Sequence, residues 1–180
     1  MIIAVIVILV LLVLYAIGVY NSLVRLRENV RNSKSQIAAQ IESRWDAIKT
    51  LIDGTSKYSD YEEKVLKDIV DSRSSIGKNS SVKEIEKDDQ QFSNVFSRLL
   101  AIVENYPQLK ASNLYENTME SINKYEDNVR HSRMIFNDTV TMYNRALMVF
   151  PKSLIASAMG FQQEEYFENT STKTDMPSWK

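Results

Sequence analysis

A long apolar stretch opens the chain, and it limits the folds that the rest can adopt. Residues 2–19 contain no charged side chain, and most of them are Ile, Val or Leu. As an α-helix these residues would rise about 27 Å, close to the hydrocarbon core of a bilayer at about 30 Å. The stretch therefore predicts a transmembrane anchor, residues 1–20, that contacts membrane lipid.

Two other interpretations of the stretch fit less well. A cleaved signal peptide needs a basic start and a small-residue cleavage site. Here no Lys or Arg precedes the apolar run, and no clear Ala-x-Ala follows it. The core helix of a soluble protein is rarely apolar on every side over such a length.

The charges that follow the anchor predict its orientation. Four basic residues come directly after it, with Glu28 as the acidic residue among them: Arg25, Arg27, Arg31 and Lys34. Positively charged flanks stay in the cytoplasm. We therefore expect a single-pass protein of the cell membrane, with the N-terminus outside and the C-terminal domain cytoplasmic.

Composition favours long helices after the anchor. The 180 residues include 4 Gly and 3 Pro, too few helix breakers for an architecture of sheets and turns. The net charge of −1 gives no electrostatic reason to expect nucleic acid as a partner. With 0 Cys, disulfides and thiolate metal sites are excluded.

Apolar residues then recur at helical spacing in four segments. The first segment continues from the anchor to Gly54 without a Pro, and its stripe is Leu23, Leu26, Val30, Ile37, Ile41, Trp45, Ile48 and Ile52. The second has Tyr58, Tyr61, Val65 and Ile69. Whether the chain reverses or only kinks at residues 47–54 stays open at this point.

The third and fourth segments are bounded by turn and cap signals. Residues 77–81 are small and polar, and Ser81 with Glu84 has capping-box spacing. The third stripe is Phe92, Val95, Phe96, Leu99, Ile102, Val103 and Tyr106, before Pro107. The fourth helix is predicted from about 111 to 150, with a heptad-like seam that ends before Pro151: Tyr115, Met119, Ile122, Tyr125, Val129, Phe136, Val140, Tyr143, Leu147 and Phe150.

These segments predict an all-α fold, in which an N-terminal transmembrane helix precedes an antiparallel four-helix bundle of long helices. Amphipathic helices of this kind must bury their stripes against one another. The bundle domain would span residues 21–151. Residues 152–168 would pack on the bundle end or on the membrane surface, and residues 169–180 would form a disordered tail.

Several short segments resemble the LemA family. They are Tyr20–Arg27, Ser35–Ile37, Gln40–Asp46, Glu104–Ala111, Tyr143-Asn144, Phe150-Pro151, Gly160-Phe161 and Tyr166–Glu168. The resemblance implies a bacterial single-pass membrane protein with a bundle of bromodomain-like arrangement and no settled biochemical activity. The sequence departs from the family pattern at Lys49, where a Pro is usual, and at Phe136, where Tyr is frequent.

We find no constellation of residues that predicts catalysis. The sole His, His131, lacks partners at metal-ligand spacing and is expected at the surface. The acidic pairs Glu62-Glu63, Asp88-Asp89 and Glu164-Glu165 are sequence neighbours, so we expect them to be solvated charges. The sequence therefore predicts no enzyme, no catalytic residue, no cofactor site and no metal site.

Two asparagines on the fourth helix could carry a polar contact. Asn137 and Asn144 are seven residues apart and share one side of the helix. Asn21 and Arg25 lie at the start of the first helix, and Asn144 would come near Asn21 at the membrane end of the bundle. A buried Asn must be hydrogen-bonded, and such a pair can fix the register between helices. We expect this structural role rather than a binding site.

The function predicted from the sequence is that of a non-enzymatic interaction or scaffold protein. Its exposed polar faces would bind a protein partner or further copies of itself. The alternative is an enzyme or small-ligand carrier with a pocket between the helices. A third hypothesis is a sensor stalk whose helices pass movement on from the membrane.

Overall fold

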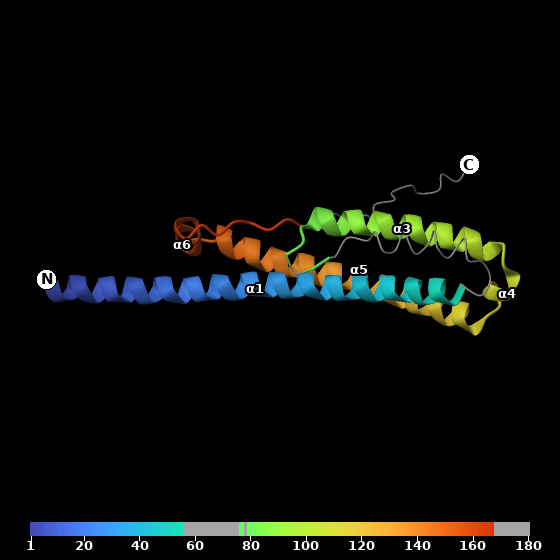
Figure 1. Cartoon of the computed structure of the whole chain (residues 1–180). Coiled ribbons are helices and arrows are strands. Elements are labelled where there is room, and N and C mark those ends of the chain that lie inside the picture. Colours follow the sequence, from blue (N-terminus) through green and yellow to red (C-terminus); the bar gives the residue numbers. More distant parts are fainter. Residues whose placement is uncertain (56–75, 78, 168–180) are drawn as a thin grey trace, which may run out of the picture.

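The computed structural model describes residues 1–55, 76–77 and 79–167, and their regular structure is entirely helical. The elements are α1 (Ile2–Thr55), α3 (Val82–Glu104), α4 (Pro107–Lys110), α5 (Asn113–Met148) and α6 (Lys152–Ala158) (Figure 1). The all-α fold class is confirmed. The predicted second stripe and the disordered tail lie outside the described residues.

Helix α1 is one continuous helix from the apolar stretch to the far end of the bundle. It spans Ile2–Thr55, so the expectation that the helix continues unbroken from the apolar stretch is confirmed. Its end agrees with the stop expected at Gly54, and the helix continues through Lys49 without a break. The open question at residues 47–54 is thereby answered, since α1 does not reverse there.

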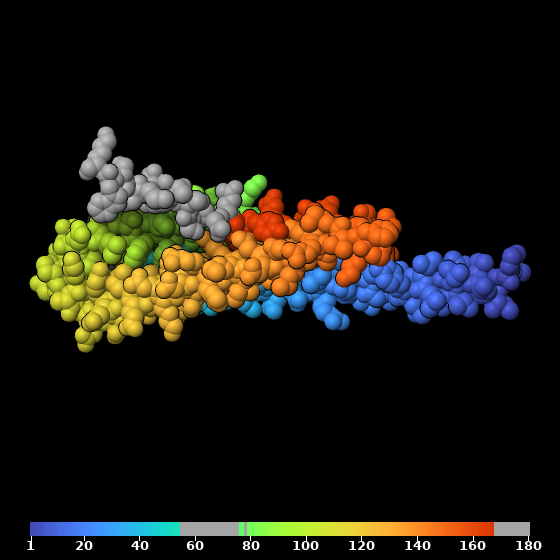
Figure 2. Space-filling view, turned by 180° about the vertical axis from the view of Figure 1, so that it is seen from behind, coloured from blue at the N-terminus to red at the C-terminus, as the bar shows by residue number. Residues whose placement is uncertain are grey.

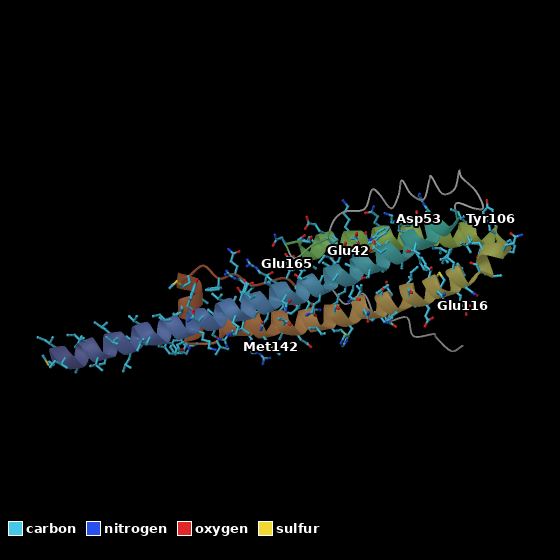
Figure 3. All side chains as sticks on the ribbon, turned by 60° about the horizontal axis from the view of Figure 1, so that its bottom comes forward. Glu42, Asp53, Tyr106, Glu116, Met142 and Glu165 are labelled. Atoms are coloured by element: carbon cyan, nitrogen blue, oxygen red, sulfur yellow. The ribbon has the colours of Figure 1, made fainter. Side chains whose placement is uncertain are left out.

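The apolar part of α1 has no neighbours. Residues 2–15 are exposed, with fractions such as 57% at Leu9 and 60% at Leu11, and their side chains project on all sides (Figure 3). Among the described residues, α1 is the helix that is long and apolar enough to cross a membrane. Residues from Val19 onward begin to contribute to the core.

Helix α3 begins with the capping box that the sequence predicts. The Ser81 side chain accepts the Glu84 N–H at 3.2 Å, and Glu84 Oε2 accepts the Ser81 N–H at 2.6 Å. The Ser81 N–H and the Ser81 hydroxyl, which both donate to Glu84 Oε2, hold the pKa of Glu84 below its usual value of 4.5. Two donors that the helix itself cannot satisfy are thus paired.

Helix α5 packs along α1 in the opposite direction, while α3 runs in the same direction as α1 (Figure 1). The Asn128 side chain of α5 donates to Gln40 Oε1 of α1 at 3.0 Å, which shows the register of the pair. The stripes predicted for α1, α3 and α5 supply most of the core: Leu23, Val30, Ile37, Ile41, Trp45, Ile48, Phe92, Val95, Leu99, Ile122, Val129, Phe136, Val140 and Tyr143.

Phe150, the last residue of the predicted seam, is not in the core. Phe150 is 75% exposed, because α5 ends at Met148 and the helical periodicity no longer applies two residues later. The following short helix, α6, contacts both α1 and α5 and buries Ala156.

Gly160 turns the chain after α6. It has φ +71°, in the left-handed region. The Phe161 N–H donates to the Ala156 carbonyl at 3.0 Å and the Gly160 N–H to the Ser157 carbonyl at 3.3 Å, the pair of bonds of a Schellman motif. Residues 161–167 then run along the bundle without regular structure, and we call them the C-terminal strap.

Candidate functional site

The most unusual chemistry in the structure is a buried guanidinium. Arg44 of α1 is 1% exposed. Its Nη1 donates to Glu126 Oε2 of α5 at 2.7 Å, and its Nη2 donates to Asp89 Oδ1 of α3 at 2.8 Å. One side chain therefore joins three helices.

Asp88 and Trp45 complete this network. Asp88 is 1% exposed, and its Oδ2 lies 3.9 Å from Arg44 Nη2. The Trp45 indole N–H donates to Asp88 Oδ2 at 3.1 Å. Arg133 of α5 adds a second cation, with its Nη2 3.1 Å from Asp89 Oδ2, although this pair lacks hydrogen-bond geometry.

Aromatic rings cover the guanidinium. The Phe92 ring centroid lies 3.9 Å from Arg44 Cζ, within the range of a cation–π contact. The same Phe92 ring meets Trp45 edge to face at 5.2 Å. We call Arg44, Trp45, Asp88, Asp89, Phe92, Glu126 and Arg133 the Arg44 network.

The Arg44 network corrects one prediction from the sequence. Asp88-Asp89 was expected to be solvated charge, but Asp88 lies in the core and Asp89 pairs with two arginines. Glu164-Glu165 has one half-buried member, Glu164, and Glu62-Glu63 lies outside the described residues. A signal was present, since Ile85, Asp88 and Phe92 follow the helical spacing of buried positions.

The network holds its charges against one another rather than presenting them to a ligand. Glu126 is 45% exposed at its side chain, whereas Arg44 and Asp88 are closed off. Removing two charges from water is costly, so such a group persists only where each charge is paired. Its contacts between α1, α3 and α5 fit a structural role, in which the network keeps these three helices aligned.

A second polar site joins α5 to the C-terminal strap. Asn144 Nδ2 donates to the Glu164 carbonyl at 2.9 Å, and the Glu164 N–H donates to Asn144 Oδ1 at 3.0 Å. Asn137 does the same with Phe167, at 3.1 and 3.0 Å. We call Asn137 and Asn144 the asparagine clasp.

The clasp replaces the partner that the sequence predicts for Asn144. Asn21 and Arg25 are exposed, and the amide of Asn144 bonds with the backbone of Glu164 instead. As predicted, the two asparagines share one side of α5. Asn137 is half-buried and Asn144 is buried, and the side-chain amide of each is hydrogen-bonded. The partner was missed because it belongs to a strap whose path depends on the turn at Gly160.

Aromatic contacts anchor the same strap. The buried Phe167 ring lies 5.1 Å from Phe136 and beneath Arg133, whose Cζ is 5.2 Å from the ring centroid. At the other end, Phe161 meets Tyr20 edge to face at 5.8 Å. Burial raises the pKa of Tyr143, the residue before Asn144, and the positive charge of Arg27 acts in the opposite direction.

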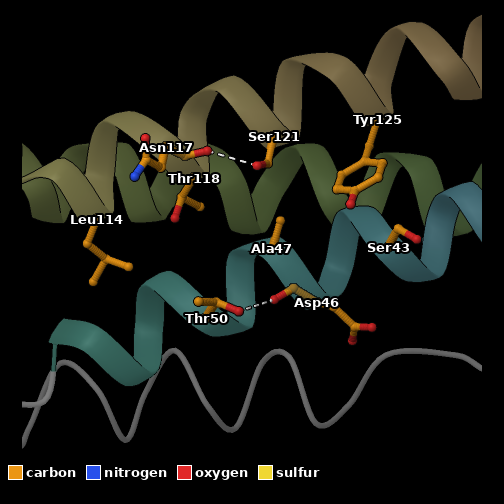
Figure 4. A pocket seen from close by; sticks show the side chains of 9 residues that line it. All are labelled: Ser43, Asp46, Ala47, Thr50, Leu114, Asn117, Thr118, Ser121 and Tyr125. Atoms are coloured by element: carbon orange, nitrogen blue, oxygen red, sulfur yellow. Dashed lines mark hydrogen bonds between the residues drawn. The ribbon is translucent and has the colours of Figure 1, made fainter.

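A shallow groove of about 410 Å³ lies between α1 and α5. Figure 4 shows its mostly small and hydroxyl-bearing lining: Ser43, Asp46, Ala47, Thr50, Leu114, Asn117, Thr118, Ser121 and Tyr125. Several of the hydroxyls are committed to backbone bonds, such as Thr50 to the Asp46 carbonyl at 2.9 Å and Ser121 to the Asn117 carbonyl at 2.8 Å. The groove therefore offers hydrogen-bonding groups to a polar molecule.

No group of three or more metal-ligating side chains is found within the described part of the chain. His131 is exposed on α5, as expected.

Comparisons with known proteins cover most of the chain. The model of the LemA family matches residues 33–180. Protein LemA of Metamycoplasma hominis is 24% identical over 156 residues, which cover 84% of this chain and 70% of that protein.

Magnetosome proteins also match, over a shorter region. Magnetosome protein MamQ of Magnetospirillum gryphiswaldense is 37% identical over 79 residues, and Magnetosome protein MamQ 2 of Paramagnetospirillum magneticum is 32% identical over 80 residues. Each match covers 44% of this chain and 29% of the relative.

Proposed function

The chain belongs to the LemA family, and from this premise we propose that it is a non-enzymatic interaction scaffold tethered to the cell membrane by α1. The apolar part of α1 makes it a membrane-associated helical protein. The observation that carries the scaffold proposal is the Arg44 network, in which each buried charge lies against an opposite charge of the same network. Charged groups that are paired in this way stabilise the bundle and are not available to act on a substrate.

The proposed topology places the N-terminus outside and the bundle in the cytoplasm. It is supported by Arg25, Arg27, Arg31 and Lys34, which follow the apolar stretch. Because the chain has 0 Cys, single cysteines report on topology without background. Met134→Cys, at a site that is 60% exposed, should react with a membrane-impermeant maleimide only after the cells are permeabilised.

Protein partners are the central expectation of the scaffold proposal. A photo-crosslinking amino acid at Met134 or Met142, both exposed on α5, would capture a protein that binds this face in cells. The same crosslinker at Ile122, which is 2% exposed, is the matched control. Reproducible adducts at the exposed sites, identified by mass spectrometry as a partner or as a second copy of this chain, support the scaffold.

The groove between α1 and α5 favours a second candidate, a bundle that binds a small ligand. Its hydroxyl-rich lining would suit a polar molecule rather than an apolar one. Native mass spectrometry of the detergent-extracted chain distinguishes the two. A copurifying small molecule that is lost on Ala47→Trp, a change that fills the groove, would favour the ligand carrier over the scaffold.

A further inference from the structure

Large apolar side chains lie exposed where α5 ends and α6 begins. Five of them form what we call the apolar end patch: Met148 at 62%, Val149 at 50%, Phe150 at 75%, Leu154 at 64% and Met159 at 58% exposed. Within α6, Ile155 and Ala156 face the bundle core, so that Leu154 is left outside it. Apolar side chains that gather in this way on a surface usually indicate a contact.

The position of the patch identifies what it would contact. Phe161, directly after α6, lies 5.8 Å from Tyr20 and 5.2 Å from Arg27 Cζ. Tyr20 comes directly after the apolar stretch of α1, so α6 lies level with the end of that stretch. Figures 1 and 2 show α6 at the end of the bundle beyond which the apolar part of α1 projects.

Basic side chains accompany the apolar ones. Arg25 and Arg145 are exposed, and Lys152 opens α6. Apolar side chains flanked by Lys and Arg are the pattern of segments that rest in the headgroup region of anionic bilayers.

We propose that the apolar end patch is a second membrane contact, by which the bundle end rests on an anionic phospholipid surface beside the α1 anchor. This inference depends on the anchoring proposed above and adds to it a second contact between the bundle and the membrane. A bilayer is favoured over a second copy of the chain because Phe161, which follows α6, contacts Tyr20 at the end of the apolar stretch.

Single-cysteine variants of the full chain test the contact. Because the sequence has 0 Cys, no other thiol reacts with the label. Leu154→Cys and Met159→Cys report on the patch, and Met134→Cys, 60% exposed in the middle of α5, is the matched control. Val10→Cys reports on the anchor. Each carries an environment-sensitive fluorophore, in nanodiscs of equal parts phosphatidylcholine and phosphatidylglycerol with doxyl-labelled lipid as quencher.

The proposal expects quenching at 154 and 159 that exceeds quenching at 134 by about twofold or more, with strong quenching at 10. It also expects the difference to shrink in phosphatidylcholine alone. Quenching at 10 with none above the control at 154 and 159 overturns the second contact and leaves the anchor intact. No quenching at 10 overturns both, and equal quenching in the two lipid mixtures overturns the anionic preference.

Discussion

Asn144 and Glu164 are joined by two hydrogen bonds, of 2.9 and 3.0 Å, between one side-chain amide and one residue's backbone. The amide supplies both a donor and an acceptor, as a neighbouring β-strand would. Asn137 repeats the arrangement with Phe167. The strap is thus held by its main chain at two positions, in addition to the ring contact of Phe167 with Phe136.

Asn144→Leu should release the strap rather than change how the helices pair. The variant leaves the N–H and the carbonyl of Glu164 without their partner, at a cost of about 1–3 kcal/mol. Hydrogen exchange followed by mass spectrometry should show faster exchange in residues 161–167 and unchanged protection in α1. Asn123→Leu, at an exposed position of the same helix, is the control. Altered helix pairing in Asn144→Leu would instead support a role for Asn144 in setting register.

Arg44→Met should destabilise the bundle by about 3–5 kcal/mol, because it removes the cation that faces the buried Asp88 and one of the two arginines that pair with Asp89. Arg44→Lys should rescue only part of this loss, since an ammonium cannot bridge two carboxylates as the planar guanidinium does. Denaturant unfolding in detergent measures both. Arg130→Met, which breaks a pair that is 73% and 77% exposed, is the control and should cost less than about 1 kcal/mol. Equal losses at positions 44 and 130 would contradict the structural role of the network.

Gly160→Ala should loosen the turn between α6 and the strap. A side chain at φ +71° costs about 1–2 kcal/mol. Gly77→Ala is the control, because Gly77 has no positive φ and nothing within 4 Å of an added Cβ. Exchange in residues 161–167 should rise for the Gly160 variant alone, and an unchanged rate there would show that the turn does not direct the strap.

The start of α3 should weaken in acid. The pKa of Glu84 is lowered in the folded state by its hydrogen bonds to Ser81. Such a group stabilises the fold above its unfolded pKa, near the usual value of 4.5, and the contribution is lost as the pH falls through the lower folded pKa. Carbon-detected NMR titration of the Glu84 carboxyl should report the lowered pKa. Ser81→Ala should return it part of the way to the usual value, because the variant removes the hydroxyl but keeps the backbone N–H of residue 81. A titration that Ser81→Ala leaves unchanged would contradict this account.

The helices could be predicted from the sequence because local signals define them. No Pro interrupts α1, Ser81 and Glu84 cap α3, and Pro151 follows the end of α5. The boundaries of α5 differ from the prediction by about two residues at each end, within the usual fraying of helix termini.

The polar sites could be predicted only in part because they depend on distant residues. Asp88 shares the spacing of Ile85 and Phe92, yet its partner Trp45 lies on another helix, 43 positions away. Asn144 was singled out, but its partner Glu164 belongs to a segment without periodicity. The burial of Asp88 and the bonds of Asn144 to the Glu164 backbone can be recognised only once the helices of the bundle are assembled.

Because α1 is unbroken, a tilt of the anchor is transmitted directly to the bundle. About 35 residues of α1 follow the apolar stretch, a length of about 50 Å, so a tilt of about 10° in the bilayer would carry the far end sideways by about 9 Å. A tether with a hinge would absorb such a swing. Here changes in bilayer thickness that alter the tilt would be magnified at the tip farthest from the lipid.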